Sequence, residues 1–375
     1  MAFFEVLLHA ALHTTIEKTF HFVKENSRRT AFLTYDMPSL LNWYSDETRA
    51  LNELPYTEIA SFLDEPWSEA ADLQVAKKTD QFRLASGPPD DLARLQTYVY
   101  DAFIKENRID KFDSKVVRLD KYSVPKRMFD VRPCKYSDGL RSNYAMDWRG
   151  RLEIGGQPFS LRSLIAHDYG SRLPPLGEAR LSNALGLAVI VWYRTEDGDI
   201  LPYLPKRPEA SVLDIALEKV GGSIKRLAVF GGGFHCTASG EAEWKPNATT
   251  FDQMFTADIC KELYEEVGLS REDLHWIVPV ALCREFLRGG KPQLFFVALA
   301  RAEAHELGPK RREAIKRQID AGRQEVLDDS LTVETPEQLY RDLARFGTIE
   351  SFANMCYAQQ CAESAYRAGA FDPRS

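Results

Sequence analysis

The sequence predicts an α/β (α+β) fold in which a mixed β-sheet lies between helices. Two hairpins indicate the sheet, because apolar runs flank the turn residues Asp197-Gly198 and, further along the chain, Gly289-Gly290. A short amphipathic helix that ends at Gly268 carries apolar side chains on one side and carboxylates on the other. A chain of 375 residues is long enough to bury a substantial core around such a sheet.

The region before the sheet is expected to begin with helices and to continue with strands. Residues 1–112 predict a mainly helical N-terminal region of unknown role, including a helix from Leu92 to Glu106. Residues 113–182 are expected to hold strands at Lys115–Val124 and Met128–Val131. The Pro- and Gly-containing segment Arg172–Gly177 then predicts a linker.

The sheet itself is expected within residues 183–355, followed by a C-terminal helix and tail over residues 356–375. Pro202, which cannot donate a backbone hydrogen bond, predicts that its strand lies at an edge. The expected strands are Leu185–Tyr193, Ile200–Leu204, Trp276–Leu282, Leu294–Ala300 and the short Ser330–Glu334, and the later helices are Pro309–Ala321, Pro336–Phe346 and Ile349–Ala368.

The amphipathic helix concentrates negative charge on one face. At about 100° per residue, Glu262, Glu265 and Glu266, with Asp258 one turn earlier, fall within an arc of roughly 100°. Like charges at these spacings cost roughly 0.2 to 0.5 kcal/mol per pair, which a hard divalent cation such as Mg²⁺ or Mn²⁺ would offset. A solvated helix face is the alternative interpretation of the same residues.

A glycine loop precedes this helix in the chain. Residues 227–229 predict a strand that breaks into the loop Phe230-Gly231-Gly232-Gly233-Phe234. A glycine loop followed by an acidic helix resembles the Nudix hydrolases, whose sequence box ends in the pattern matched here from Lys261 to Leu269. Lys261 stands where that pattern has arginine. The first half of the box is interrupted, with Gly240-Glu241 after the loop, an insertion over residues 242–249, and a helix-capping box at residues 250–253.

The resemblance implies a Nudix-like mixed sheet, with residues 183–355 as a catalytic domain that cleaves a diphosphate linkage in a nucleotide or nucleotide derivative. Water would attack phosphorus with the help of Mg²⁺, or alternatively Mn²⁺. Glu265 and Glu266 would be the main metal ligands, and Glu262 a third ligand or the general base. The carbonyl of Gly231 would be a backbone ligand. Lys261 takes the place of an arginine that orients a glutamate through a salt bridge.

Substrate-binding candidates lie on the hairpin that follows the box. Phe286 could stack on a base, and Arg284 and Arg288 could bind phosphate. The alternative places Phe286 in the core and both arginines in solvent. His235, beside the glycine loop, is interpreted as structural rather than phosphate-binding.

Composition limits the classes of partner. With 44% apolar and 27% charged residues and a net charge of -7, the chain is typical of globular proteins and predicts no broad nucleic-acid surface. No apolar run is long enough for a membrane span, and six scattered cysteines indicate a reducing, cytoplasmic setting. Homo-oligomerisation stays open. The alternative functions are a catalytically silent, Nudix-like nucleotide-sensing or regulatory module and a scaffold for protein contacts.

Overall fold

The main element of the fold is a six-stranded mixed sheet. The computed structural model describes residues 37–48, 55–63, 72–85, 113–147, 149–154, 157–205, 235–321 and 349–367. The strand order is β1-β10-β11-β7-β8, with β9 also paired to β7. The strands are β1 (Tyr56–Ser61), β7 (Gly186–Arg194), β8 (Ile200–Tyr203), β9 (Ala238–Glu241), β10 (Leu274–Glu285) and β11 (Lys291–Glu303). The predicted α+β class is confirmed.

Both predicted hairpins are present. Strands β7 and β8 pair antiparallel around Gly198, and β10 and β11 pair antiparallel around Gly289 and Gly290. All three glycines have positive φ, a conformation that other residues rarely adopt. Pro202 lies in β8, which ends the strand order, so its predicted edge position is confirmed. Strands β11 and β7 pair in parallel at the centre.

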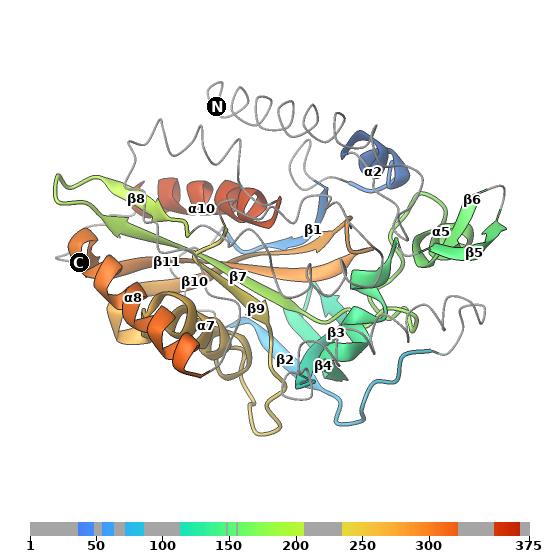
Figure 1. Ribbon diagram of the computed structural model, residues 1–375, viewed down its shortest axis with the longest axis horizontal. Helices are drawn as coiled ribbons and strands as arrows, with labels where there is room; N and C mark the ends of the chain where they lie inside the picture. The colour runs from blue at the N-terminus through green and yellow to red at the C-terminus, as the bar shows by residue number, and fades with distance from the viewer. Residues whose placement is uncertain are drawn as a thin grey trace.

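Helices cover both faces of this sheet (Figure 1). Helices α7 (Ala257–Val267) and α8 (Ala304–Asp320) lie on one face, and α10 (Ile349–Arg367) lies on the other. Successive residues of β7 point to opposite faces, so Leu187 and Val189 pack in the core on the α7 side, while Ala188 and Ile190 pack with α10. Burial on both faces explains why β7 is a continuous apolar run.

A second, three-stranded sheet packs against the start of α7. Its order is β2 (Gln74–Lys77), β4 (Met128–Lys135) and β3 (Lys115–Ser123), and β3 and β4 confirm two predicted strands. Phe129 of β4 lies with its ring centroid 5.5 Å from Phe251 and 5.4 Å from Phe255. These rings belong to the same hydrophobic cluster as the α7 side of the main sheet.

Backbone hydrogen bonds join the two sheets in a closed ring of three. Val117 donates to the carbonyl of Ala242 (2.7 Å), Ala242 donates to Leu185 (2.9 Å), and Leu185 donates to Val117 (2.8 Å). The hydrophobic core therefore runs without a break across the predicted division at residues 182 and 183.

The N-terminal region contributes strands as well as a helix. The described part of residues 1–112 contains α2 (Met37–Trp43) together with β1 and β2, neither of which the sequence predicted. Strand β1 forms the edge of the main sheet by pairing with residues 281–285 of β10. The predicted helix at residues 92–106, the glycine loop at 230–234 and the elements at 330–346 lie outside the described residues.

Smaller elements connect the two sheets: α4 (Tyr136–Leu140), η3 (Asn143–Ala145), β5 (Arg149–Ile154), β6 (Gln157–Ser160) and α5 (Leu161–Tyr169). Residues 172–177, where a linker was predicted, have no regular secondary structure, and Leu173 within them is buried. Helix α8 begins at Ala304, ahead of the predicted Pro309, and α10 continues through residues 355 and 356 without a break. Among the described helices, none has the length and apolar character that crossing a bilayer requires.

Candidate active site

Helix α7 is held at its start by polar side chains. A π-helical turn, Asp252–Thr256, leads into it. The Thr250 hydroxyl accepts a hydrogen bond from the backbone N–H of Gln253 (3.3 Å), and the Gln253 side chain accepts one from the N–H of Thr249 (2.8 Å). The predicted capping box is thus present with its return bond shifted by one residue.

Gly268 ends α7 for two separate reasons. Its φ of 77° is left-handed, and its N–H donates to the carbonyl of Leu263. A Cβ at this position would also lie 2.4 Å from the backbone oxygen of Lys310 in α8. The glycine therefore ends the helix and lets α8 pack closely against it, while Ile259 and Val267 are fully buried beneath.

The Glu262 side chain lies across strand β9. A Cβ on Gly240 would come within 2.7 Å of the Glu262 carboxyl carbon and 2.8 Å of its Oε1. Gly240 thereby leaves a space on the α7 face that the Glu262 carboxylate fills. This contact gives Gly240 a definite role that its position in the interrupted sequence box did not indicate.

The surroundings of Glu262 raise its pKa. Burial, followed by the negative charge of Glu265, raises the pKa of Glu262 from 4.5 to about 7. Asp258 and Glu243 act in the same direction, and Lys261 opposes them. A carboxyl with a pKa near neutrality can accept or release a proton under physiological conditions.

Lys261 forms an ion pair, with Nζ 2.7 Å from Oε1 of Glu243. Burial alone would lower the pKa of Lys261, but Glu243, Glu265 and Glu262 together raise it. The resemblance implied a salt bridge to a glutamate for this position without identifying the partner. Glu243 comes two residues after the end of β9, within the predicted insertion 242–249, so its spacing from Lys261 along the chain gave no indication of the pair.

Asp258 lies on the acidic arc of the helix but has a structural role. Its side chain is buried, accepts a hydrogen bond from the N–H of Glu243 (2.6 Å) and lies 2.5 Å from Nζ of Lys245. Burial raises the pKa of Asp258, and the ammonium of Lys245 opposes that rise. Asp258 thus ties the segment after β9 to the first turn of α7.

Glu265 and Glu266 are both half-buried on α7. Glu265 is close enough to raise the pKa of its neighbour Glu262, and its backbone carbonyl accepts a hydrogen bond from Gln318 of α8 (2.5 Å). Within the described part of the chain, no three His, Cys, Asp or Glu side chains converge to hold a metal ion. Gly231, the predicted backbone ligand, lies outside the described residues.

Two of the three predicted substrate-binding residues serve the fold. Phe286 is fully buried, with its ring centroid 5.1 Å from that of Tyr44, which confirms the core interpretation. Arg284 is buried rather than exposed. Its Nε donates to the carbonyl of Gly290 (2.9 Å) and its Nη2 to that of Pro174 (2.6 Å). Both side chains face backbone and core, so neither is placed to meet a nucleotide.

Arg288 lies in a charged cluster on the α10 side of the sheet. Its guanidinium lies 4.7 Å from the ring centroid of Tyr144 and 3.5 Å from the Glu285 carboxylate. Tyr144 donates to Glu241 (2.7 Å), which also pairs with Lys291 at 3.2 Å. Against the effect of burial, Glu285, Tyr144 and Glu350 of α10 raise the pKa of Arg288, which places it near α10, whereas Glu262 belongs to α7 on the other face of the sheet.

His235 belongs to the same side of the molecule. It is buried, with Nε2 3.6 Å from a carboxylate oxygen of Glu350 in α10. Burial tends to raise the pKa of Glu350, but the hydrogen bond and charge of His235, together with the charges of Arg288 and Lys291, lower it to about 2. The structural interpretation of His235 agrees with these contacts.

Comparisons with known proteins do not show the family of this chain. Neither a scan against protein-family models nor a search of curated proteins found a match.

Proposed function

We propose that this chain is a metal-dependent hydrolase of the Nudix type that cleaves a diphosphate linkage in a nucleotide or nucleotide derivative. The observation that carries the proposal is the carboxyl of Glu262, which lies over Gly240 beside Glu265 with its pKa raised to about 7. The ion pair between Lys261 and Glu243 supports it, because the resemblance implies a salt bridge from that position to a glutamate.

The residues present suit a hard divalent cation. Mg²⁺ commonly takes only one or two protein carboxylates and completes its shell with water and substrate phosphate oxygens. Glu265 and Glu266 would supply such a pair, and Glu262 would be a third ligand or the general base. A bound cation would neutralise the diphosphate and lower the pKa of an attacking water. Mn²⁺ has the same preference for oxygen ligands.

Glu262 is the group best suited to move a proton. A general base works best when its pKa is near the working pH, and burial beside Glu265 brings Glu262 to about 7. In its ionised form Glu262 would accept the proton of the attacking water. Lys261, held by Glu243, keeps a positive charge beside the carboxylates and limits their mutual repulsion.

The cellular setting we propose is the cytoplasm. All six cysteines lie in described residues and all are free thiols, five of them buried. Reduced cysteines are typical of proteins in reducing compartments.

Glutamine substitutions test the hydrolase proposal. The change Glu262→Gln, and separately the pair Glu265→Gln and Glu266→Gln, should abolish Mg²⁺-dependent product formation across nucleoside triphosphates, nucleotide sugars and dinucleoside polyphosphates. Glu313→Gln is the matched control, because that side chain is 72% exposed on α8. Turnover that persists in both variants would refute the assignment of these carboxylates.

A nucleotide sensor without catalysis is the second candidate. The observation that favours it is that no three carboxylates converge in the described residues. Thermal shift with nucleotides, with and without Mg²⁺, separates the candidates when paired with product analysis. Stabilisation without product after long incubation supports the sensor, whereas product formation excludes it.

A further inference from the structure

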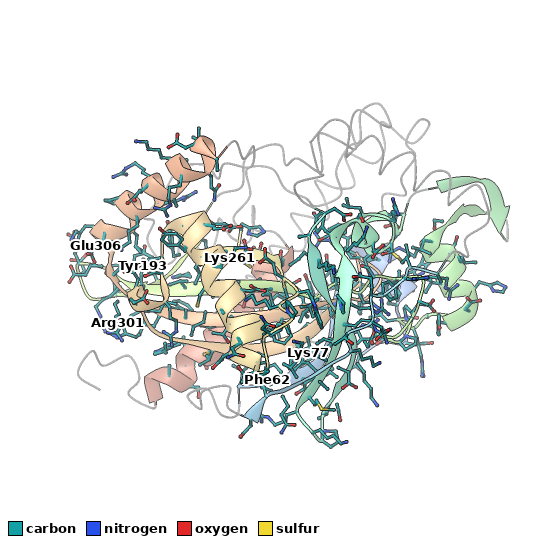
Figure 2. The ribbon with its side chains drawn as sticks, turned by 90° about the horizontal axis from the view of Figure 1, so that it is seen from below. Phe62, Lys77, Tyr193, Lys261, Arg301 and Glu306 are labelled. Atoms are coloured by element: carbon teal, nitrogen blue, oxygen red, sulfur yellow. The ribbon has the colours of Figure 1, made fainter. Side chains whose placement is uncertain are left out.

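Lys77, at the end of β2, forms hydrogen bonds with the loop that connects β9 to α7. Its ammonium donates to the backbone carbonyls of Lys245 (3.1 Å), Pro246 (2.6 Å) and Ala248 (2.7 Å). The same ammonium lies 5.2 Å from the ring centroid of Trp244. Lysine has three N–H donors, and each has a carbonyl here. Figure 2 labels Lys77 and Lys261, which come from β2 and α7.

The loop of residues 245–248 is a tight turn. The N–H of Ala248 donates to the carbonyl of Lys245 (3.2 Å), with Pro246 and Asn247 at the central positions. Proline at the first central position is typical of such turns. The turn places the carbonyls of residues 245, 246 and 248 within reach of one ammonium, and the Lys245 carbonyl accepts from both Ala248 and Lys77.

A chain of contacts leads from this loop to the candidate active site. Lys245 lies 2.5 Å from Asp258 and also donates to the carbonyl of Gln253 (3.2 Å), so it holds the turn before α7 and the first turn of the helix together. Asp258 in turn accepts from the N–H of Glu243, whose carboxylate pairs with Lys261. Glu262 is the next residue along the helix.

We propose that Lys77 is a positioning residue for the candidate active site: by fixing the loop of residues 245–248, it holds Glu243 and Asp258 in place and thereby orients Glu262. The inference rests on the proposed function for its catalytic consequence. It also gives the N-terminal region a role, since β2 belongs to residues 1–112, outside the part of the chain that resembles a Nudix domain.

The hydrogen bonds of Lys77 connect the three-stranded sheet to the loop before α7, the helix that lies on the six-stranded sheet. Strand β2 pairs in parallel with β4, and Lys77 is opposite Val131 in that pairing. Loss of the ammonium would leave β2 in its sheet while releasing the carbonyls of residues 245, 246 and 248. The expected disturbance is therefore local to the loop and to the start of α7.

The change Lys77→Met tests the proposal in the full chain, because Met keeps the length and apolar stem of lysine without its charge. Lys78→Met is the matched control: Lys78 is the next residue, is half-exposed, and pairs with Asp120 away from the loop. Hydrogen exchange should speed up in the Glu243 amide and the first turn of α7 in Lys77→Met, and should stay unchanged in β11. The Lys78→Met variant should match the wild type.

The kinetic constants distinguish a residue that positions the catalytic group from one that only stabilises the fold. We expect Lys77→Met to lower kcat by about tenfold or more with little change in KM, since small misplacements of catalytic groups cost up to about a hundredfold. The carboxyl carbon of Glu262, observed by NMR at one fixed pH and assigned with Glu262→Gln, should shift and broaden in Lys77→Met, because a loosened loop no longer fixes Glu243 and Asp258 beside it.

The outcomes distinguish this inference from the proposed function. A Lys77→Met protein that matches Lys78→Met in loop exchange and in the Glu262 carboxyl signal overturns the inference, as does one that loosens the loop and leaves both kcat and that signal unchanged. If the wild type hydrolyses no nucleotide, the proposed function fails, and the exchange and the carboxyl signal still decide whether Lys77 positions Glu262.

Discussion

The change Glu262→Gln should remove a defined part of the pH dependence of the protein's stability. Burial and the charge of Glu265 raise the pKa of Glu262 from 4.5 to about 7, so the folded protein holds this proton more tightly than the unfolded chain does. The stability that comes from this proton is fully present below pH 4.5 and is lost as the pH rises through 7. The loss is about 3 kcal/mol at most, since one pKa unit corresponds to about 1.4 kcal/mol.

Glutamine cannot ionise, so the variant escapes this loss. The difference in unfolding free energy between variant and wild type should therefore shift in favour of the variant by up to about 3 kcal/mol between pH 4.5 and pH 8. Urea unfolding at several pH values, with divalent ions removed by chelation, measures it. Glu313→Gln, on the exposed face of α8, should show no such dependence.

Added Mg²⁺ extends the test to the proposed cation. A cation bound at the carboxylates favours the ionised form of Glu262, so it should stabilise the wild type at pH 8 and should do little for Glu262→Gln. A stability difference that is the same at every pH would refute the electrostatic reasoning. A response to Mg²⁺ that is equal in both proteins would refute the assignment of Glu262 to the cation.

Three further substitutions have separable effects. Gly240→Ala places a methyl group 2.7 Å from the Glu262 carboxyl carbon, and that side chain can move aside. We therefore expect at least about a tenfold loss of kcat and less than about 3 kcal/mol of destabilisation, and an unchanged kcat would count against the contact. Gly177→Ala, where the nearest atom to the added carbon is 3.8 Å away, is the control. Lys261→Met breaks a half-exposed pair with Glu243 and should lower kcat while changing unfolding free energy by less than about 1 kcal/mol. Phe286→Ala should cost about 3 to 5 kcal/mol in denaturant unfolding, and a fully stable variant would contradict its place in the core.

Local signals allowed the hairpins and α7 to be predicted from the sequence. Turn glycines with positive φ separate the paired strands, and Gly268 ends α7 where the apolar period stops. These features depend on residues close together in the chain, so their physical cause is visible in a short stretch of sequence.

Long-range partners explain what the sequence did not reveal. Strand β1 pairs with residues 281–285 of β10, far along the chain, and its own residues show no clear alternation of buried and exposed side chains. Glu243 reaches Lys261 only because the intervening loop folds back onto α7. Arg284 reads as a solvent or phosphate residue until the fold brings the carbonyls of Gly290 and Pro174 to its guanidinium.

The candidate site was foreseen in part. The carboxylates were identified from helical spacing, but the sequence could not say that Lys245 pairs with Asp258 or that Gly240 makes room for the Glu262 carboxylate. These contacts depend on β9 and on the loop that follows it, which periodicity within one helix does not report.

The ring of hydrogen bonds among Val117, Leu185 and Ala242 has a practical consequence for anyone who wishes to shorten this protein. A fragment starting at residue 183 would match the resemblance and still be incomplete. It would uncover the rings of Phe251 and Phe255, remove the edge strand that shields β10, and leave unpaired backbone open to aggregation. Soluble, active protein should therefore be sought with the preceding strands retained.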